Sequence, residues 1–327
     1  MHDLMRSCKH KNFWVMEQKN GYFNGSEYNL AIVPGLVRSW TYHDISRGAN
    51  GVLFYRWRAN RWGQEQNPNG LLRHDGTPRR AYEEVLQTNR ELKKLEEKGC
   101  FISNTQVEAK VAIIHSYDNI WSFEAKKQYR YYDCIALEME YYNSLTEMGI
   151  TVDFISPEDD FSGYKLIIAP YLMCVSEKQA SNFKHYAENG GRIIFGPRSG
   201  MKSINNAVVD IPWPGLLRNI CGITVEEFEA FPPDSGNFVI WNGRKYPVKI
   251  WADIMSLNGS KSVAVYSEKF YKNTPAVTKN KIGKGVVYYC GIAGCKEFLY
   301  EFLSSLCTEI GLETAELPHN VFLSYRS

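Results

Sequence analysis

"GVLFYRWR" at residues 51–58 is the stretch that decides how the first part of the chain folds. Its first half is continuously apolar, which is typical of a parallel β-strand covered on both faces. The run "FWVME" (13–17) predicts a second, short buried strand that ends on a glutamate. A helix predicted from Pro34 to Gly48 connects the two runs, and a crossover of this length makes the strands parallel neighbours.

A second predicted helix, from Thr77 through Glu97, completes the order strand, helix, strand, helix within residues 1–98. Two strands and two helices cannot close a sheet, because the outer edge of each strand stays unpaired. We therefore expect this segment to be the last β/α units of a larger TIM barrel, an incomplete piece whose other strands are not in this chain.

The pattern restarts after Gly99 and predicts a second domain over residues 99–312. Short apolar runs alternate with helices, which predicts an open, doubly wound parallel sheet. The runs lie at 110–116, 151–156, 164–170 and 192–197, and the helices at 132–148 and 176–189.

The end of the second domain has a different pattern. Residues 237–291 are expected to be antiparallel, with "NKIGKG" (280–285) as a hairpin turn, and a helix over 296–310 closes the domain. The tail "LPHNVFLSYRS" (317–327) predicts one further strand, and residues 313–327 are expected to be the start of a truncated C-terminal β domain.

Composition excludes several classes of protein. The formal charge is +2 with scattered lysines and arginines, so we expect neither nucleic acid nor a membrane as a partner. The eight cysteines form no CxxC pair, which favours reduced thiols in a cytoplasmic protein over disulfides or a zinc site. No apolar run reaches transmembrane length, and the first twelve residues lack the apolar core of a signal peptide. No metal and no cofactor is expected.

Two glutamates are candidates for chemistry. Functional side chains of a β/α barrel sit at the C-terminal ends of the strands and in the loops that follow. Glu17 ends the first predicted strand, and Glu65 lies in the loop after the second, which suits the carboxylate pair of a glycosidase. Each glutamate also has a non-functional interpretation. A glutamate at the end of a strand is more often an ordinary solvated side chain, and a glutamate in a loop can be solvated without any partner.

Three blocks carry a resemblance to a known family. "FWVMEQKNG" (13–21), "PGLVRSWTYHDISRGANGVLFYRWR" (34–58) and "GQEQNPNGLLRHDGTPRRAYEEV" (63–85) together resemble the C-terminal part of the catalytic barrel of glycoside hydrolase family 42, the β-galactosidases. The downstream domain is similar to that family's flavodoxin- or class I amidotransferase-like trimerisation domain. The resemblance implies hydrolysis of terminal β-D-galactosides with retention, and a homotrimer.

The resemblance also implies roles for particular residues. Glu17 matches the catalytic nucleophile, which must stay ionised, so we expect hydrogen-bond donors around it, with Arg56 and Tyr55 as candidates. Glu65 matches a carboxylate that accepts hydrogen bonds from the sugar hydroxyls. Trp62 is a candidate stacking wall for the sugar, although barrel packing explains a tryptophan there equally well.

Three departures from the family pattern bear on activity. The family's acid/base glutamate lies in an "NE" dipeptide on an earlier strand, and no residue of this chain matches it. The tryptophan expected eight residues after the nucleophile is Gly25, and the sugar-binding histidine expected three residues after Glu65 is Pro68. The resemblance therefore implies a fragment that is inactive alone.

Two other functions stay open from the sequence. In one, the chain is a non-catalytic oligomerisation module that carries a remnant of a barrel. In the other, the second domain is an acyl-transfer or ligand-binding unit with His115 and Cys174 as its reactive residues. Against the latter, the elbow after one strand reads "FGPRSG" (195–200), with no nucleophile where one is expected, and a structural thiol explains Cys174.

Overall fold

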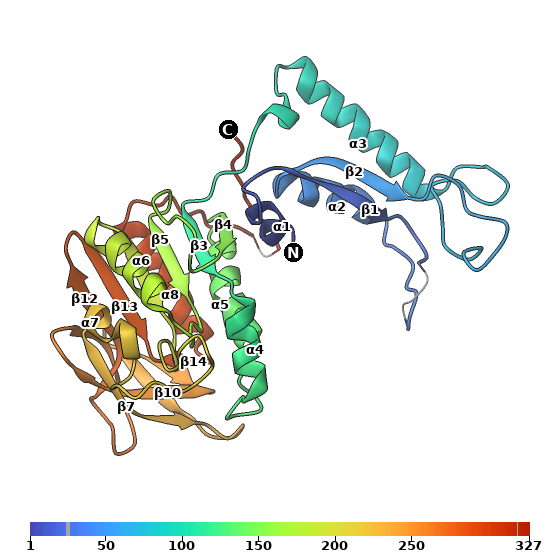
Figure 1. Ribbon diagram of the computed structural model, residues 1–327. Helices are drawn as coiled ribbons and strands as arrows, with labels where there is room; N and C mark the ends of the chain where they lie inside the picture. Colours follow the sequence, from blue (N-terminus) through green and yellow to red (C-terminus); the bar gives the residue numbers. More distant parts are fainter. Residues whose placement is uncertain (24–26, 319) are drawn as a thin grey trace. The chain divides into compact units, whose positions relative to one another are not determined.

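The computed structural model describes residues 1–23, 27–318 and 320–327. Two compact units make up the chain (Figure 1). Unit 1 consists of Met1–Glu108 together with Ser324–Ser327, and unit 2 is Ala109–Leu323.

Unit 1 is built around a pair of parallel strands, β1 and β2 (Figure 1). Its elements in chain order are α1 (His2–Ser7), β1 (Phe13–Lys19), α2 (Leu36–Ser46), β2 (Ala49–Tyr55), α3 (Arg80–Glu97) and the short 3-10 helix η1 (Ile102–Asn104). The predicted strand–helix–strand–helix order and the parallel pairing are confirmed, while α1 had no signal in the sequence.

The two faces of the β1–β2 pair are unlike each other. On one face, Phe54 packs with α2 and α3 in a small apolar cluster around Val37 and Ala81. On the other face Trp14 and Met16 are 62% and 64% exposed, and the Trp14 ring lies against Gly51, where any side chain would collide with it. The expectation that these strands are covered on both faces is wrong for this chain, because no described element lies over the second face.

Helix α2 begins without a capping side chain of its own. Instead, the buried carboxylate of Glu84, on α3, accepts from the backbone N–H groups of Gly35 (3.0 Å) and Val37 (3.1 Å). Free N–H groups at a helix start attract negative charge, so one side chain joins the two helices and satisfies the start of α2.

Glu84→Gln is expected to destabilise this junction by about 1–3 kcal/mol, because a neutral amide loses the charge-assisted bonds to the start of α2. Hydrogen exchange of the peptide over residues 33–40 measures the effect, and faster exchange is the expected result. The exposed neighbour Glu83 supplies the matched control, Glu83→Gln. Equal exchange in the two variants would contradict the role of Glu84.

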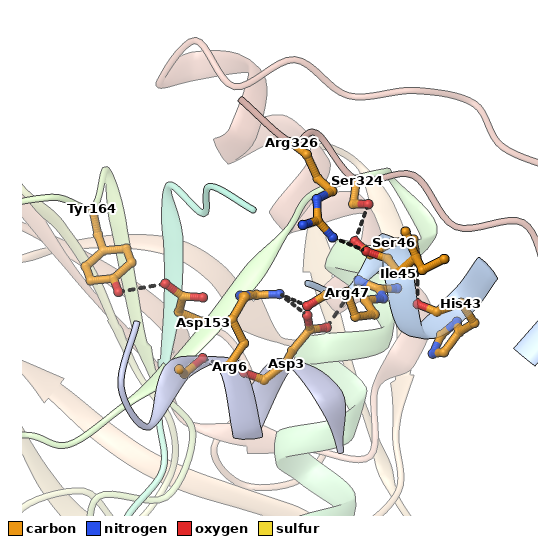
Figure 2. Close-up of polar contacts among 11 residues, drawn as sticks. Asp3, Arg6, His43, Ile45, Ser46, Arg47, Asp153, Tyr164, Ser324 and Arg326 are labelled. Carbon is orange, nitrogen blue, oxygen red and sulfur yellow. Dashed lines mark hydrogen bonds and ion pairs between the residues drawn. The ribbon is translucent and has the colours of Figure 1, made fainter. Parts of the chain in front are cut away.

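A buried ion network fixes α1 to the rest of unit 1 (Figure 2). Asp3 Oδ1 accepts from Arg6 Nη1, and Asp3 Oδ2 lies 3.1 Å from Arg47 Nη1. Arg6 also donates to the carbonyl of Arg47 (3.2 Å). The side chains of Asp3, Arg6 and Arg47 are all at most 4% exposed, so this carboxylate balances two charges that water does not reach.

The last residues of the chain run along unit 1 and do not form the predicted strand. Among the described residues of this segment, Arg326 alone forms a β-bridge, with Val107. The Arg326 guanidinium donates to the Ile45 carbonyl (2.6 Å), and the Ser324 hydroxyl donates to the Ser46 carbonyl (2.6 Å) (Figure 2). Arg326 also donates to the Ile102 carbonyl (2.9 Å). Side-chain hydrogen bonds to backbone carbonyls hold this segment in place. Strand propensity does not predict such bonds.

Unit 2 has a large mixed sheet and a small one. The nine-stranded sheet has the order β4-β3-β5-β6-β13-β12-β11-β8-β9, and the three-stranded sheet has the order β14-β10-β7. The strands are β3 (Val111–Ile114), β4 (Val152–Ile155), β5 (Leu166–Ala169), β6 (Arg192–Phe195), β7 (Ile223–Ala230), β8 (Asn237–Trp241), β9 (Arg244–Val248), β10 (Trp251–Leu257), β11 (Lys261–Tyr266), β12 (Pro275–Ile282), β13 (Gly285–Cys290) and β14 (Ile292–Ala293). The helices are α4 (Tyr117–Ala125), α5 (Cys134–Glu147), α6 (Glu177–Glu188), α7 (Arg218–Cys221), α8 (Lys296–Glu309) and the 3-10 helix η2 (Gly215–Leu217).

The first half of the large sheet follows the sequence pattern. Strands β3, β4, β5, β6 and β13 pair in parallel, and β3, β4 and β5 are buried along their whole length. Within β4, Asp153 accepts from the Tyr164 hydroxyl (2.9 Å), which satisfies a polar side chain between apolar neighbours (Figure 2). The antiparallel hairpin of β12 and β13 is confirmed, whereas α4 was not predicted.

Candidate active site

Glu17 lies near the C-terminal end of β1, where the pairing with β2 is irregular between Val15 and Gln18. Such irregularities redirect side chains, and they are common next to active sites. The Glu17 carboxylate is exposed, and among the described residues no hydrogen bond or ion pair reaches it. Neither of the two candidate donors, Arg56 and Tyr55, bonds to Glu17 among the described residues.

The two expected donors are instead bonded to Glu65. The Tyr55 hydroxyl and the Arg56 Nη2 both donate to Glu65 Oε2, and Arg56 also contacts the Tyr55 hydroxyl. The pKa of Glu65 is lowered, first because Tyr55 donates to the carboxylate and then because Arg56 is positively charged. The same hydrogen bond raises the pKa of Tyr55. Glu65 thus stays ionised and can accept further hydrogen bonds.

The loop between β2 and α3 carries Glu65 back to the end of β2. It is closed by backbone hydrogen bonds from Leu71 N to the Arg56 carbonyl (2.8 Å) and from Leu72 N to the Trp57 carbonyl (2.7 Å). These bonds join residues that are about fifteen positions apart. No local motif signals such a closure, which is why the sequence did not assign Tyr55 and Arg56 to Glu65.

Trp62 lies in the same loop and is strongly exposed, with the Arg61 guanidinium 5.5 Å from its ring centroid. The described residues leave the rest of the ring uncovered, so packing in this chain does not explain it. Of the two substituted family positions, Pro68 is buried and Gly25 lies outside the described residues. The roles of Glu17, Glu65 and Trp62 stay predictions.

In unit 2, the two residues considered for acyl transfer have separate surroundings. His115 Nδ1 lies 3.0 Å from Glu138, which also accepts from the Tyr171 hydroxyl (2.5 Å). Burial raises the pKa of the Cys174 thiol, against a smaller opposite effect of Ser122 and Lys202. No hydrogen bond joins His115 to Cys174 in the described part of the chain, and a thiol with a raised pKa is a poor nucleophile.

The described residues, 1–23, 27–318 and 320–327, contain no group of three or more His, Cys, Asp or Glu side chains that could hold a metal ion. No helix among them is both long and apolar enough to cross a membrane.

The fold places the chain in a class of α/β proteins found among solved β-galactosidases. The structure of the β-galactosidase from Bacillus circulans sp. alkalophilus matches 99% of this chain and 49% of its own, with a TM-score of 0.93 and 30% identity. The β-galactosidase of the Antarctic haloarchaeon Halorubrum lacusprofundi matches 99% of this chain and 48% of its own, with a TM-score of 0.91 and 32% identity.

Family models match nearly the whole chain. The model described as "Beta-galactosidase" covers residues 1–95, and the model described as "Beta-galactosidase trimerisation domain" covers residues 109–313. The chain belongs to glycoside hydrolase family 42, the family of these β-galactosidases.

Curated relatives agree with this assignment. The β-galactosidase BgaB of Geobacillus sp. (strain Y412MC61) is 37% identical over 309 residues, which are 94% of this chain and 45% of the relative. The β-galactosidase BgaA of Planococcus sp. (strain 'SOS Orange') is 34% identical over 321 residues, which are 95% of this chain and 47% of the relative. The chain thus spans about half the length of the curated relatives that it matches.

Proposed function

We propose that this chain is the C-terminal part of a retaining glycoside hydrolase that cleaves terminal β-D-galactosides. The observation that carries the proposal is the position of Glu17 at the end of β1, beside the parallel strand β2 whose following loop holds Glu65. In this proposal residues 1–98 are the last β/α units of a TIM barrel, and residues 99–312 are a flavodoxin- or amidotransferase-like domain that forms a homotrimer. Residues 313–327 begin a C-terminal β domain.

The proposed chemistry needs two carboxyl groups about 5–5.5 Å apart. Glu17 attacks the anomeric carbon and forms a covalent galactosyl ester, while an acid supplied by the missing barrel strands protonates the leaving oxygen. That acid then acts as the base that activates water for hydrolysis of the ester. Glu65 accepts from sugar hydroxyls through the oxygen that Tyr55 and Arg56 leave open. Trp62 offers its exposed ring to the face of the sugar.

The uncovered face of β1 and β2 supports an incomplete barrel. Trp14, Met16 and Leu53 are large apolar side chains that are at least 40% exposed, and this is unusual on two strands of a parallel sheet. In a closed barrel the remaining strands would cover this face. The eight cysteines are all free, which supports a cytoplasmic protein.

The test is to complete the barrel. The chain alone is expected to leave an aryl β-galactoside intact, because it has no acid/base. Mixed or fused with the barrel segment of the Geobacillus relative that it lacks, it should release the phenol and give β-galactose as the first product by NMR. Turnover by the chain alone would disprove the fragment assignment, and α-galactose as the first product would disprove retention.

A non-catalytic association module is the second candidate, favoured by the match of unit 2 to a trimerisation domain. It predicts that the completed barrel stays inactive while the chain still assembles. If the completed barrel still hydrolyses the aryl β-galactoside after a buffer exchange, this candidate is excluded.

A further inference from the structure

Unit 2 exposes a group of large apolar side chains on α4 and α5, the two helices of the connection between β3 and β4. Trp121 and Tyr117, on α4, are 64% and 57% exposed. Ile135 and Met139, one turn apart on α5, are each 38% exposed, and Tyr142 follows them as a partly buried ring. These five residues form the α4–α5 face.

Ring contacts connect the two helices across this face. The Trp121 and Tyr117 rings have centroids 6.0 Å apart, and Tyr117 lies edge-on to His115 at 5.1 Å. From His115 the contacts continue through Phe154 to Tyr142 on α5, with centroids 6.1 and 5.5 Å apart. Tyr142 lies on the same side of α5 as the two exposed aliphatic residues before it. The exposed side chains thus belong to one continuous surface.

The size and composition of the α4–α5 face indicate an interaction surface. Its exposed side chains present roughly 400 Å² to water, and apolar patches of this size on a soluble monomer are often functional. Tryptophan and tyrosine are among the residues that contribute most to binding at protein interfaces. A Trp121 ring that is mostly in water is therefore better explained by a partner than by packing within the unit.

Two ion pairs lie at the ends of the helices that carry the face. At the end of α4, Lys127 Nζ lies 2.9 Å from Glu124. At the end of α5, Lys296 Nζ lies 3.6 Å from Glu147. Apolar side chains with charges around them are typical of protein–protein interfaces, which have few charges at their centre.

A second apolar surface lies beside α4. The turn over residues 203–208 exposes Ile204 (65%) and Val208 (56%). Asn206 Oδ1, in this turn, accepts from Ser122 Oγ of α4 (2.6 Å), so the turn and the helix are neighbours. Copies related by a threefold rotation meet through two different surfaces of each copy. Two neighbouring apolar surfaces meet this requirement, because each can contact the other surface of the next copy around the axis.

A second copy of the chain is the occupant that these observations favour. Unit 2 is the part of the chain that matches a trimerisation domain. A saccharide site combines rings with several polar groups that point to the ligand, whereas Ile135 and Met139 continue the exposed rings of this face with aliphatic side chains. Apolar surface of this kind is complementary to other apolar surface, such as the 203–208 turn.

We propose that the α4–α5 face of one copy binds the 203–208 turn of the next copy, and that this contact holds three copies together. The inference rests on the homotrimer of the proposed function and adds the surfaces that form it. It predicts that association depends on unit 2 and not on the exposed face of β1 and β2.

Sedimentation velocity of the full chain over a range of concentrations is the test. Trp121→Asp and Ile204→Asp should each weaken association about hundredfold, because each places a charge in an apolar contact. Phe270→Asp is the matched control, since it changes an 81% exposed ring between β11 and β12, and it should associate like the native chain. Circular dichroism verifies that each variant keeps the fold. In the native chain, hydrogen exchange within residues 117–142 should slow as the concentration rises.

Four results would overturn the inference. A trimer that persists in both Trp121→Asp and Ile204→Asp would put the contact elsewhere and leave the homotrimer of the proposed function intact. Dissociation by Trp14→Asp alone would assign the association to the exposed face of β1 and β2. Binding of a soluble β-galactan that Trp121→Asp abolishes without a change in mass would make the face a carbohydrate surface. A monomeric native chain would refute the homotrimer as well, whereas an inactive completed barrel would refute only the hydrolysis.

Discussion

Glu17→Gln in the completed barrel is expected to lower turnover of an aryl β-galactoside on the order of 10⁴-fold or more. The amide has the shape of the carboxylate but neither its charge nor its nucleophilicity, so the covalent ester cannot form. The rate of phenol release at saturating substrate measures the effect. Glu27→Gln is the matched control, because Glu27 is an exposed glutamate on the loop after β1 and should retain native activity.

Azide distinguishes a lost nucleophile from a damaged site. In Glu17→Ala, the space left by the side chain admits azide, which attacks the anomeric carbon from the face opposite to the leaving group. The aryl oxide departs, and α-galactosyl azide is the expected product. A β-configured azide would mean that Glu17 acts as the acid/base, and no azide product with full residual hydrolysis would remove Glu17 from the reaction.

Asp3→Asn is expected to destabilise unit 1 by about 3–5 kcal/mol. The neutral amide would leave Arg6 and Arg47 buried without the carboxylate that balances them, since both guanidinium groups are at most 4% exposed. A domain stability of about 5–15 kcal/mol leaves little margin for such a loss. Limited proteolysis measures the effect, with faster cleavage within residues 1–108 as the expected result.

Unit 2 provides the internal reference for this experiment. The segment 109–323 should be cleaved at the same rate in Asp3→Asn and in the native chain, because Asp3 belongs to unit 1. Glu97→Gln, which changes an exposed glutamate at the end of α3, should leave both rates unchanged. Equal cleavage of residues 1–108 in the Asp3 and Glu97 variants would show that the ion network contributes little.

Local pattern was sufficient for most of the elements. Continuous apolar runs such as "VAII" (111–114) and "LIIA" (166–169) form buried parallel strands, because a strand covered on both faces has no position for a polar side chain. The same reasoning predicted where β1 and β2 lie in the sequence, but it did not predict which of their faces are covered. It predicted cover on both faces, whereas Trp14 and Met16 are exposed, since cover depends on elements that this chain does not contain.

The sequence by itself determined the order of strands and helices, the position of Glu17 at a strand end, and the family to which the blocks around it belong. Only the tertiary structure decided which groups meet: Tyr55 and Arg56 bind Glu65 and not Glu17, and Asp3 balances two arginines. The physical reason is the range of the interactions. Hydrophobic periodicity repeats within a few residues and can be seen in the sequence. A hydrogen bond that closes a loop joins residues far apart in the sequence, so it depends on the folded path of the chain.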